Sequence, residues 1–267
     1  MAHKIIRYLK FIKIIFSLSF QKMSEYRVSF ALTVLSTNLW ILVDIIWLLL
    51  IFEYTDYFAQ YTNWQYFGFI GIFSFVRNLF HFIFHDSVYR LTDHIYDGKI
   101  DTWITKPLSS QFLASFVSFN MISIANIVLG LIIFIISLVK IGAQITLWKV
   151  LLFVYIVALA VIFMYSFMFS LLCLTFWLGR LSAFNDFLSQ FFDDPAEIPT
   201  MAYKGVLKFA FYFIIPIVLV ATLPTSVFYF GIDYKYILYY SVFVLISFAF
   251  SRFIWNRGLR VYSSVSS

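Results

Sequence analysis

Three basic side chains fall on one face of a strongly apolar segment of the sequence. Arg77, His81 and His85 follow one another at four-residue steps, and Asp86 comes directly after. Residues four apart lie on the same side of an α-helix, and two histidines so spaced can bind zinc or iron. Membrane enzymes that hold two irons use many more histidines than the four in this chain. We therefore expect no metal site here, and a metal-dependent membrane enzyme remains the weakest alternative.

Asp44 and Arg77 are the two formally charged residues that lie deep within apolar segments. A lone charge inside a bilayer is costly, so such residues usually pair or line a polar cavity. At 1.5 Å per helical residue, Asp44 lies roughly 12 Å and Arg77 roughly 18 Å from the outer ends of their segments. We predict that they pair. The pair then serves as a brace between neighbouring helices or lines a path for a substrate or ion.

The composition determines what kind of protein positions these residues. Hydrophobic residues make up 63% of the 267 residues, charged residues only 12%, and the mean hydropathy is +0.91. A soluble domain cannot bury that much apolar surface. The net charge of +6 is spread over loops rather than gathered beside exposed aromatics, which argues against nucleic-acid binding.

The apolar segments predict a single all-α integral membrane domain over residues 1–267, with six transmembrane helices and no separate soluble domain. Pro216 and Pro224 should kink or break the fifth of these helices, because proline removes a helix hydrogen bond. The expected spans are 28–52, 65–84, 113–139, 150–178, 206–230 and 236–255.

Basic residues give the expected orientation. Fifteen of them flank one side of these spans, including the loops 85–112 and 179–208, whereas only Lys140, Lys149 and Lys235 flank the other. By the positive-inside rule, both termini lie in the cytoplasm. Residues 1–27 carry apolar side chains on one helical arc and cations on the other, which predicts an amphipathic helix at the membrane surface, either an anchor or a lever joined to the first span.

The cytoplasmic stretch 90–110, RLTDHIYDGKIDTWITKPLSS, mixes charges with apolar residues. Gly98 can adopt a positive φ, and Pro107 can end a short helix. The apolar residues Ile95, Ile100, Trp103 and Ile104 have helical spacing, so we favour a surface that docks a partner over a solvated connector. No phosphate-binding loop, dinucleotide fingerprint, HExxH or GxSxG motif occurs, so any use of ATP must come from another chain.

Three motifs carry a resemblance to a known family. The sequence resembles six-span permeases of the type-2 ATP-binding-cassette (ABC) exporter superfamily in three places. These are IYDGKIDTWITKPLSSQF, the stretch LSQFFDDPAEIP followed by FYFIIPIVLVATLPTSVFYFG, and the tail WNRGLRVYSSVSS. The acidic FFDDP is a departure, because basic residues are expected before this proline.

The resemblance implies a transmembrane subunit of an exporter in the bacterial cytoplasmic (inner) membrane, with no cofactor of its own. Two copies of a separate ABC ATPase subunit would carry ATP and Mg, and a second permease, identical or related, would complete the complex. The ATPase-coupling loop would comprise Asp97, Gly98, Asp101, Trp103, Lys106 and Pro107, and push on the first two spans and the amphipathic helix. An ATP-independent channel or ion-coupled carrier using Asp44 and Arg77 is the main alternative, and the substrate stays open.

Overall fold

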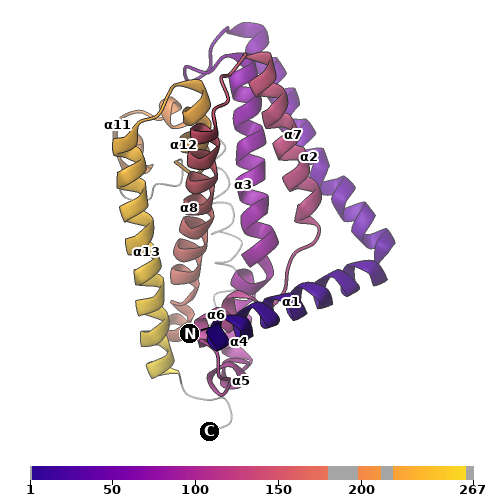
Figure 1. The fold of residues 1–267 in the computed structure, drawn as a ribbon, viewed down its shortest axis with the longest axis vertical. Coiled ribbons are helices and arrows are strands. Elements are labelled where there is room, and N and C mark those ends of the chain that lie inside the picture. Colours follow the sequence, from indigo (N-terminus) through magenta and orange to yellow (C-terminus); the bar gives the residue numbers. More distant parts are fainter. Residues whose placement is uncertain (1, 180–197, 212–218, 263–267) are drawn as a thin grey trace.

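The structure is a computed structural model that describes residues 2–179, 198–211 and 219–262. Its regular elements are all helices, apart from one isolated bridge between Phe58 and Tyr61. This confirms the all-α prediction. Among the described residues, five helices are long and apolar enough to cross a membrane: α2 (Arg27–Tyr54), α3 (Asn63–Tyr89), α7 (Ser123–Lys140), α8 (Leu147–Leu172) and α13 (Tyr234–Val261) (Figure 1).

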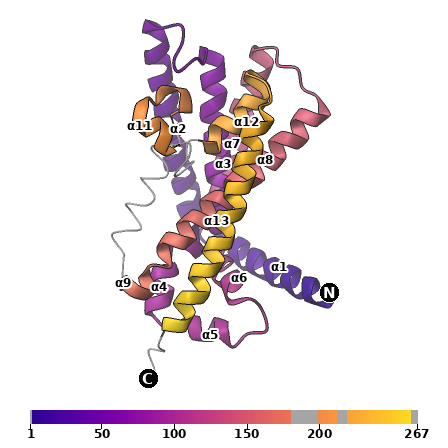
Figure 2. The ribbon, with the colours of Figure 1, turned by 90° about the vertical axis from the view of Figure 1, so that its left-hand side faces the viewer.

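The expected span 206–230 does not form one long helix in the part of the chain that the structure describes. It contains α11 (Gly205–Phe209) and α12 (Leu219–Tyr229), with Pro224 inside α12, whereas Pro216 lies outside the described residues. Eleven helical residues rise about 16 Å, roughly half of a bilayer core. Both Figure 1 and Figure 2 place α11 at the end of the bundle away from α1 (Ala2–Glu25).

The position of α11 changes the charge count behind the orientation. Lys204, just before α11, and Lys208, within it, were assigned to the side of the N-terminus, but α11 lies at the opposite end (Figure 2). That assignment is wrong for these two residues. Both residues must be subtracted from the side counted with fifteen basic residues and added to the side counted with three. The side of α1 still has a strong excess of basic residues.

The expected span 113–139 is also interrupted. A short helix, α6 (Ser110–Ser115), covers only its first three residues, and α7 begins only at Ser123. The backbone N–H groups of the intervening turn find other acceptors: Val117 donates to Ser87 Oγ at 2.9 Å, and Phe119 to Ser19 Oγ at 2.9 Å. Non-helical backbone near a membrane needs such partners. The prediction of one continuous helix is therefore wrong.

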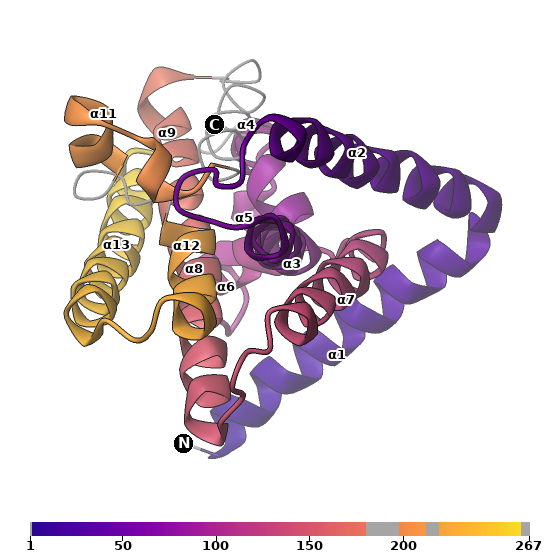
Figure 3. The ribbon, with the colours of Figure 1, turned by 90° about the horizontal axis from the view of Figure 1, so that it is seen from above.

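Helix α3 lies at the centre of the bundle, with α7, α8 and α12 around it (Figure 3). It approaches α7 most closely where Gly71 faces Gly130. A Cβ atom added at Gly71 would lie 2.8 Å from the Gly130 carbonyl oxygen, and one at Gly130 would lie 2.6 Å from the Gly71 oxygen. Small residues allow such close backbone contact between membrane helices. This glycine pair therefore sets the spacing of α3 and α7.

The N-terminal helix α1 lies across one end of the bundle and joins α2 at Tyr26 (Figure 1). The predicted helix is confirmed over Ala2–Glu25. Its Tyr8 ring contacts Phe112 edge-on with centroids 4.5 Å apart, and Tyr8 Oη accepts a hydrogen bond from Ser109 N at 3.2 Å. These contacts brace α1 against α6 as well as joining it to the first span.

Candidate functional site

Residues 90–110 fold into two short helices at the same end as α1, α4 (Leu91–Tyr96) and α5 (Ile100–Ile104) (Figure 1). Gly98 connects them with φ at 72°, the left-handed conformation that the sequence predicted for it. The backbone N–H of Lys99 donates to His94 O at 3.0 Å and closes the turn. Pro107 follows α5 after two residues. The segment is thus a folded helical hairpin.

Most of the apolar residues in this hairpin face inward. Ile95, Ile100 and Trp103 are buried, and the Trp103 ring lies edge-on to His94 with centroids 5.4 Å apart. The expectation that the apolar set docks a partner is therefore wrong for these three residues, which pack in the core of this chain. Ile104 is 51% exposed and Tyr96 is 56% exposed.

The outer face of the hairpin is what a partner would meet. We define the hairpin surface as its exposed residues, Tyr96, Asp97, Lys99, Thr102, Ile104, Thr105, Lys106 and Pro107. Lys99 Nζ lies 3.7 Å from Asp97 Oδ2, and both side chains are half exposed, so this ion pair adds little stability. Asp101 is partly buried. The surface therefore combines apolar area from Ile104, Tyr96 and Pro107 with polar and charged side chains such as Lys106.

A hydrogen-bond network ties α6 to the long helices. Gln111 Nε2 donates to Tyr165 Oη of α8 at 3.2 Å and to Ser251 Oγ of α13 at 3.3 Å. Ser115 Oγ lies 2.6 Å from the same Tyr165 oxygen. All four side chains are buried. Sequence reasoning missed this network, although Gln111 and Ser251 stand out as polar residues in apolar surroundings.

Two further contacts join the hairpin region to neighbouring elements. Trp255 Nε1 of α13 donates to Ser110 Oγ at 3.1 Å, and Thr92 Oγ1 of α4 lies 3.3 Å from Thr175 Oγ1 at the start of α9 (Thr175–Leu178). Partial burial and the nearby Asp101 carboxylate raise the pKa of Tyr262, at the end of α13. The tail motif that contains Trp255 and Tyr262 therefore contacts both the hairpin and α6.

Asp44 and Arg77 line the same cavity of about 290 Å³ between α2, α3 and α7. Asn78 and Asn126 line it too, and Asn126 Nδ2 donates to Asn78 Oδ1 at 3.2 Å. The Arg77 guanidinium carbon lies 5.8 Å from the centre of the Phe73 ring. The structure thus brings the two charges to one polar cavity. Their direct pairing stays a prediction.

A double-mutant cycle tests that pairing. We expect Asp44→Asn and Arg77→Gln each to lower the stability of the purified protein, and the double variant to lose less than the two losses combined. The expected coupling is about 0.5–3 kcal/mol, the range for side chains that interact directly. Thermal unfolding in detergent measures it, with Thr37→Val as a control at another polar residue of the cavity. Strictly additive losses would show that the two charges act separately.

The two histidines of α3 lie close to each other and to an acid. The His81 and His85 ring centroids are 4.9 Å apart, and His85 Nδ1 lies 3.2 Å from Asp86 Oδ1. Ser118 Oγ donates to the other carboxylate oxygen at 2.9 Å. Within the described ranges, no group of three or more His, Cys, Asp or Glu side chains is arranged to hold a metal. The geometry therefore gives the metal-enzyme alternative no support.

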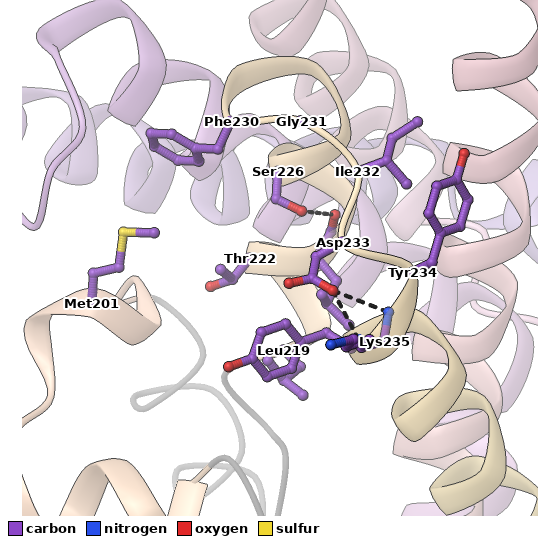
Figure 4. Close-up of a pocket in the computed structure, with 12 residues that line it drawn as sticks. Met201, Leu219, Thr222, Ser226, Phe230, Gly231, Ile232, Asp233, Tyr234 and Lys235 are labelled. Carbon is purple, nitrogen blue, oxygen red and sulfur yellow. Dashed lines mark hydrogen bonds between the residues drawn. The ribbon is translucent and has the colours of Figure 1, made fainter.

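A cavity of about 810 Å³ lies beside the loop that joins α12 to α13 (Figure 4). Asp233 points toward the first turn of α13, where it accepts hydrogen bonds from Lys235 N at 3.0 Å and Tyr236 N at 3.4 Å. Its carboxylate is therefore a helix cap. Ser226 Oγ likewise donates to a backbone oxygen, that of Leu223. These polar groups therefore stabilise the local backbone through hydrogen bonds.

The long apolar helices, the polar intramembrane cavity and the folded hairpin at one end define a multi-pass helical membrane protein. A family model described as ABC-2 family transporter protein matches residues 38–266. The chain belongs to this family and is a transporter permease subunit. No curated relative and no solved structure matches the chain.

Proposed function

We propose that this chain is the transmembrane subunit of an ABC exporter whose ATP hydrolysis takes place on two copies of a separate cytoplasmic subunit. The observation that carries the proposal is the hairpin surface. A buried base, formed by Ile95, Ile100 and Trp103, holds this surface rigidly, while Ile104 and Lys106 point outward. A force applied to a rigid, anchored element moves the helices to which it is attached.

The contacts of the hairpin suggest which helices would move. The sequence led us to expect the first two spans and α1. The hydrogen bonds lead instead from α6 to α8 and α13, through Gln111, Tyr165 and Ser251, while α1 rests on Phe112 of α6. We therefore propose that the ATPase would act on α8, α13 and α1 together, and on α3 through its direct connection to α4.

For the membrane topology, we propose six crossings with both termini in the cytoplasm of a bacterial cell. The excess of basic residues on the side of α1 supports this orientation. A cysteine at Lys13 should be labelled from the cytoplasmic side only, and one at Lys235 from the opposite side only, in a Cys173→Ser background. The reverse pattern would overturn the orientation.

A second permease, identical or related, would complete the translocation path. The apolar side chains of α2 support this part of the proposal. Leu32, Leu35 and Trp47 are each more than half exposed, so this helix makes few contacts within its own chain. Its outer face suits lipid or a neighbouring permease equally well, and the two arrangements differ in subunit stoichiometry, which the mass of the purified complex measures.

The proposal predicts that the chain co-purifies from mild detergent with an ATPase that carries a phosphate-binding loop. ATP hydrolysis by the complex should exceed that of the isolated ATPase subunit and should require magnesium. The alternative, an ATP-independent channel or carrier, is supported by the polar cavity around Asp44 and Arg77. Ion flux through liposomes that contain this chain alone would favour the alternative and contradict the ABC exporter.

A further inference from the structure

A second cavity lies where α1, α2 and α3 meet the turn 116–122. Its volume is about 370 Å³, and we define the interfacial pocket by six of the residues that line it: Ser19, Lys22, Ser29, Arg90, Ser118 and Asn120. Phe30 and Met121 add apolar surface beside them. The pocket is at the same end of the bundle as the amphipathic helix, which is the level of lipid headgroups for a helix of this type (Figure 1).

The charges of the interfacial pocket favour an anion. Lys22 and Arg90 are exposed, and neither forms an ion pair within 4 Å among the residues that the structure describes. Asp86 also lines the pocket, but its two oxygens are engaged by His85 and Ser118. Two cations therefore lie beside one carboxylate that already has hydrogen-bond donors. The hydroxyls of Ser19 and Ser29 and the Asn120 amide group can donate to a further oxygen ligand, whereas the Ser118 hydroxyl already donates to Asp86.

The pocket continues into the membrane. Thr33, Asn120 and Ile122 line both the interfacial pocket and the polar cavity that contains Asp44 and Arg77. Within that cavity Asn126 is 94% buried, and its Oδ1 atom accepts no hydrogen bond. Figures 1 and 3 show the reason for the continuity, because α2 diverges from α3 and α7 toward the end that carries α1. A polar groove therefore runs inward from the membrane surface.

We propose that the interfacial pocket binds the phosphate of a phospholipid of the cytoplasmic leaflet, with Lys22 and Arg90 holding the phosphate oxygens and the acyl chains lying against Phe30 and the exposed face of α2. Anionic phosphatidylglycerol is preferred over phosphatidylcholine, because the trimethylammonium group of phosphatidylcholine would lie against the same two cations. The position at headgroup level and the adjoining apolar surface favour a lipid over a soluble phosphate. This inference does not depend on the ATPase partner.

Native mass spectrometry of the purified chain, in micelles that contain equal amounts of the two lipids, tests the proposal. The test variant is Lys22→Gln with Arg90→Gln. The matched control is Lys10→Gln with Lys13→Gln, which removes the same charge from exposed residues of α1 outside the pocket. We expect the wild type and the control to retain phosphatidylglycerol preferentially, and the test variant to lose at least about tenfold of that retention.

The conservative variant Lys22→Arg with Arg90→Lys should keep the lipid, which separates loss of charge from loss of folding. Equal retention by the test variant and the wild type would overturn the proposal. So would an equal loss in the control variant, because the lipid would then be held by the diffuse charge of α1. Displacement of the lipid from the wild type by inorganic phosphate alone would identify a soluble phosphate as the occupant and would also overturn it.

Discussion

Replacing Ile104 and Lys106 together by glutamate is expected to reduce the ATPase recovered with the permease at least about tenfold, while the permease stays folded. Both side chains are exposed, so the change leaves the buried base of the hairpin intact. It removes the exposed aliphatic side chain of Ile104 and reverses the charge of Lys106. A desolvated interface penalises the unpaired charges that result.

The matched control for this prediction is Leu147→Glu with Lys149→Glu. These residues have similar types and the same spacing, and they lie in the first turn of α8 at the opposite end of the bundle, with Leu147 exposed and Lys149 partly exposed. The control should bind the ATPase as the wild type does. Quantitative mass spectrometry of the purified complexes measures the ratio. Full ATPase binding by the Ile104 and Lys106 variant would show that the partner docks elsewhere.

Gly71→Val is expected to have the second large effect, a loss of most of the folded, monodisperse protein. A Cβ at this position would lie 2.8 Å from the Gly130 carbonyl oxygen and 2.9 Å from the Phe134 backbone nitrogen, and neither backbone atom can move without separating α3 from α7. Overpacking of this kind costs about 1–3 kcal/mol or more. Ala31→Val on the exposed face of α2 is the control.

Size-exclusion chromatography and the thermal unfolding midpoint measure the effect of Gly71→Val. The Ala31→Val protein should elute and unfold as the wild type does. Normal elution and an unchanged midpoint for Gly71→Val would mean that α3 and α7 are not held at the distance that the structure gives.

The sequence predicted the features that depend on composition and local chemistry. Apolar runs of the right length became the long helices, the arc of residues on α1 became a helix, and Gly98 adopts the positive φ expected of it. Each of these features follows from side-chain periodicity or from backbone sterics, and both of these causes act between residues that are close in the sequence. The docking of Tyr8 on Phe112 did require it, and was not predicted.

The incorrect predictions share a physical cause. The turn at 116–122 reads as part of an apolar helix, but Ser19 and Ser87 accept the hydrogen bonds of its backbone, and both lie far from it in the sequence. Ile95, Ile100 and Trp103 have the spacing of a docking surface, yet the same spacing suits an inward face. Hydrophobic periodicity identifies an apolar face without identifying what covers it.

The polar cavity, too, was predicted only in part from the sequence. The charges of Asp44 and Arg77 pointed to a shared environment, and both residues line one cavity. The contribution of Asn126 and the continuity with Lys22 and Arg90 depend on how α2 diverges from α7, which no local pattern records. Polar residues within long apolar runs are the signal that would have identified Asn78 and Asn126.

The most direct test of the central claim is photo-crosslinking from the hairpin surface in intact membranes. A photoreactive amino acid in place of Ile104 should crosslink to an ATPase that carries a phosphate-binding loop, and the yield should fall when ATP is removed. The same amino acid in place of Leu147, which is also exposed but lies at the other end of the bundle, should give no such product. Crosslinking of the ATPase from Leu147 but not from Ile104 would contradict the account.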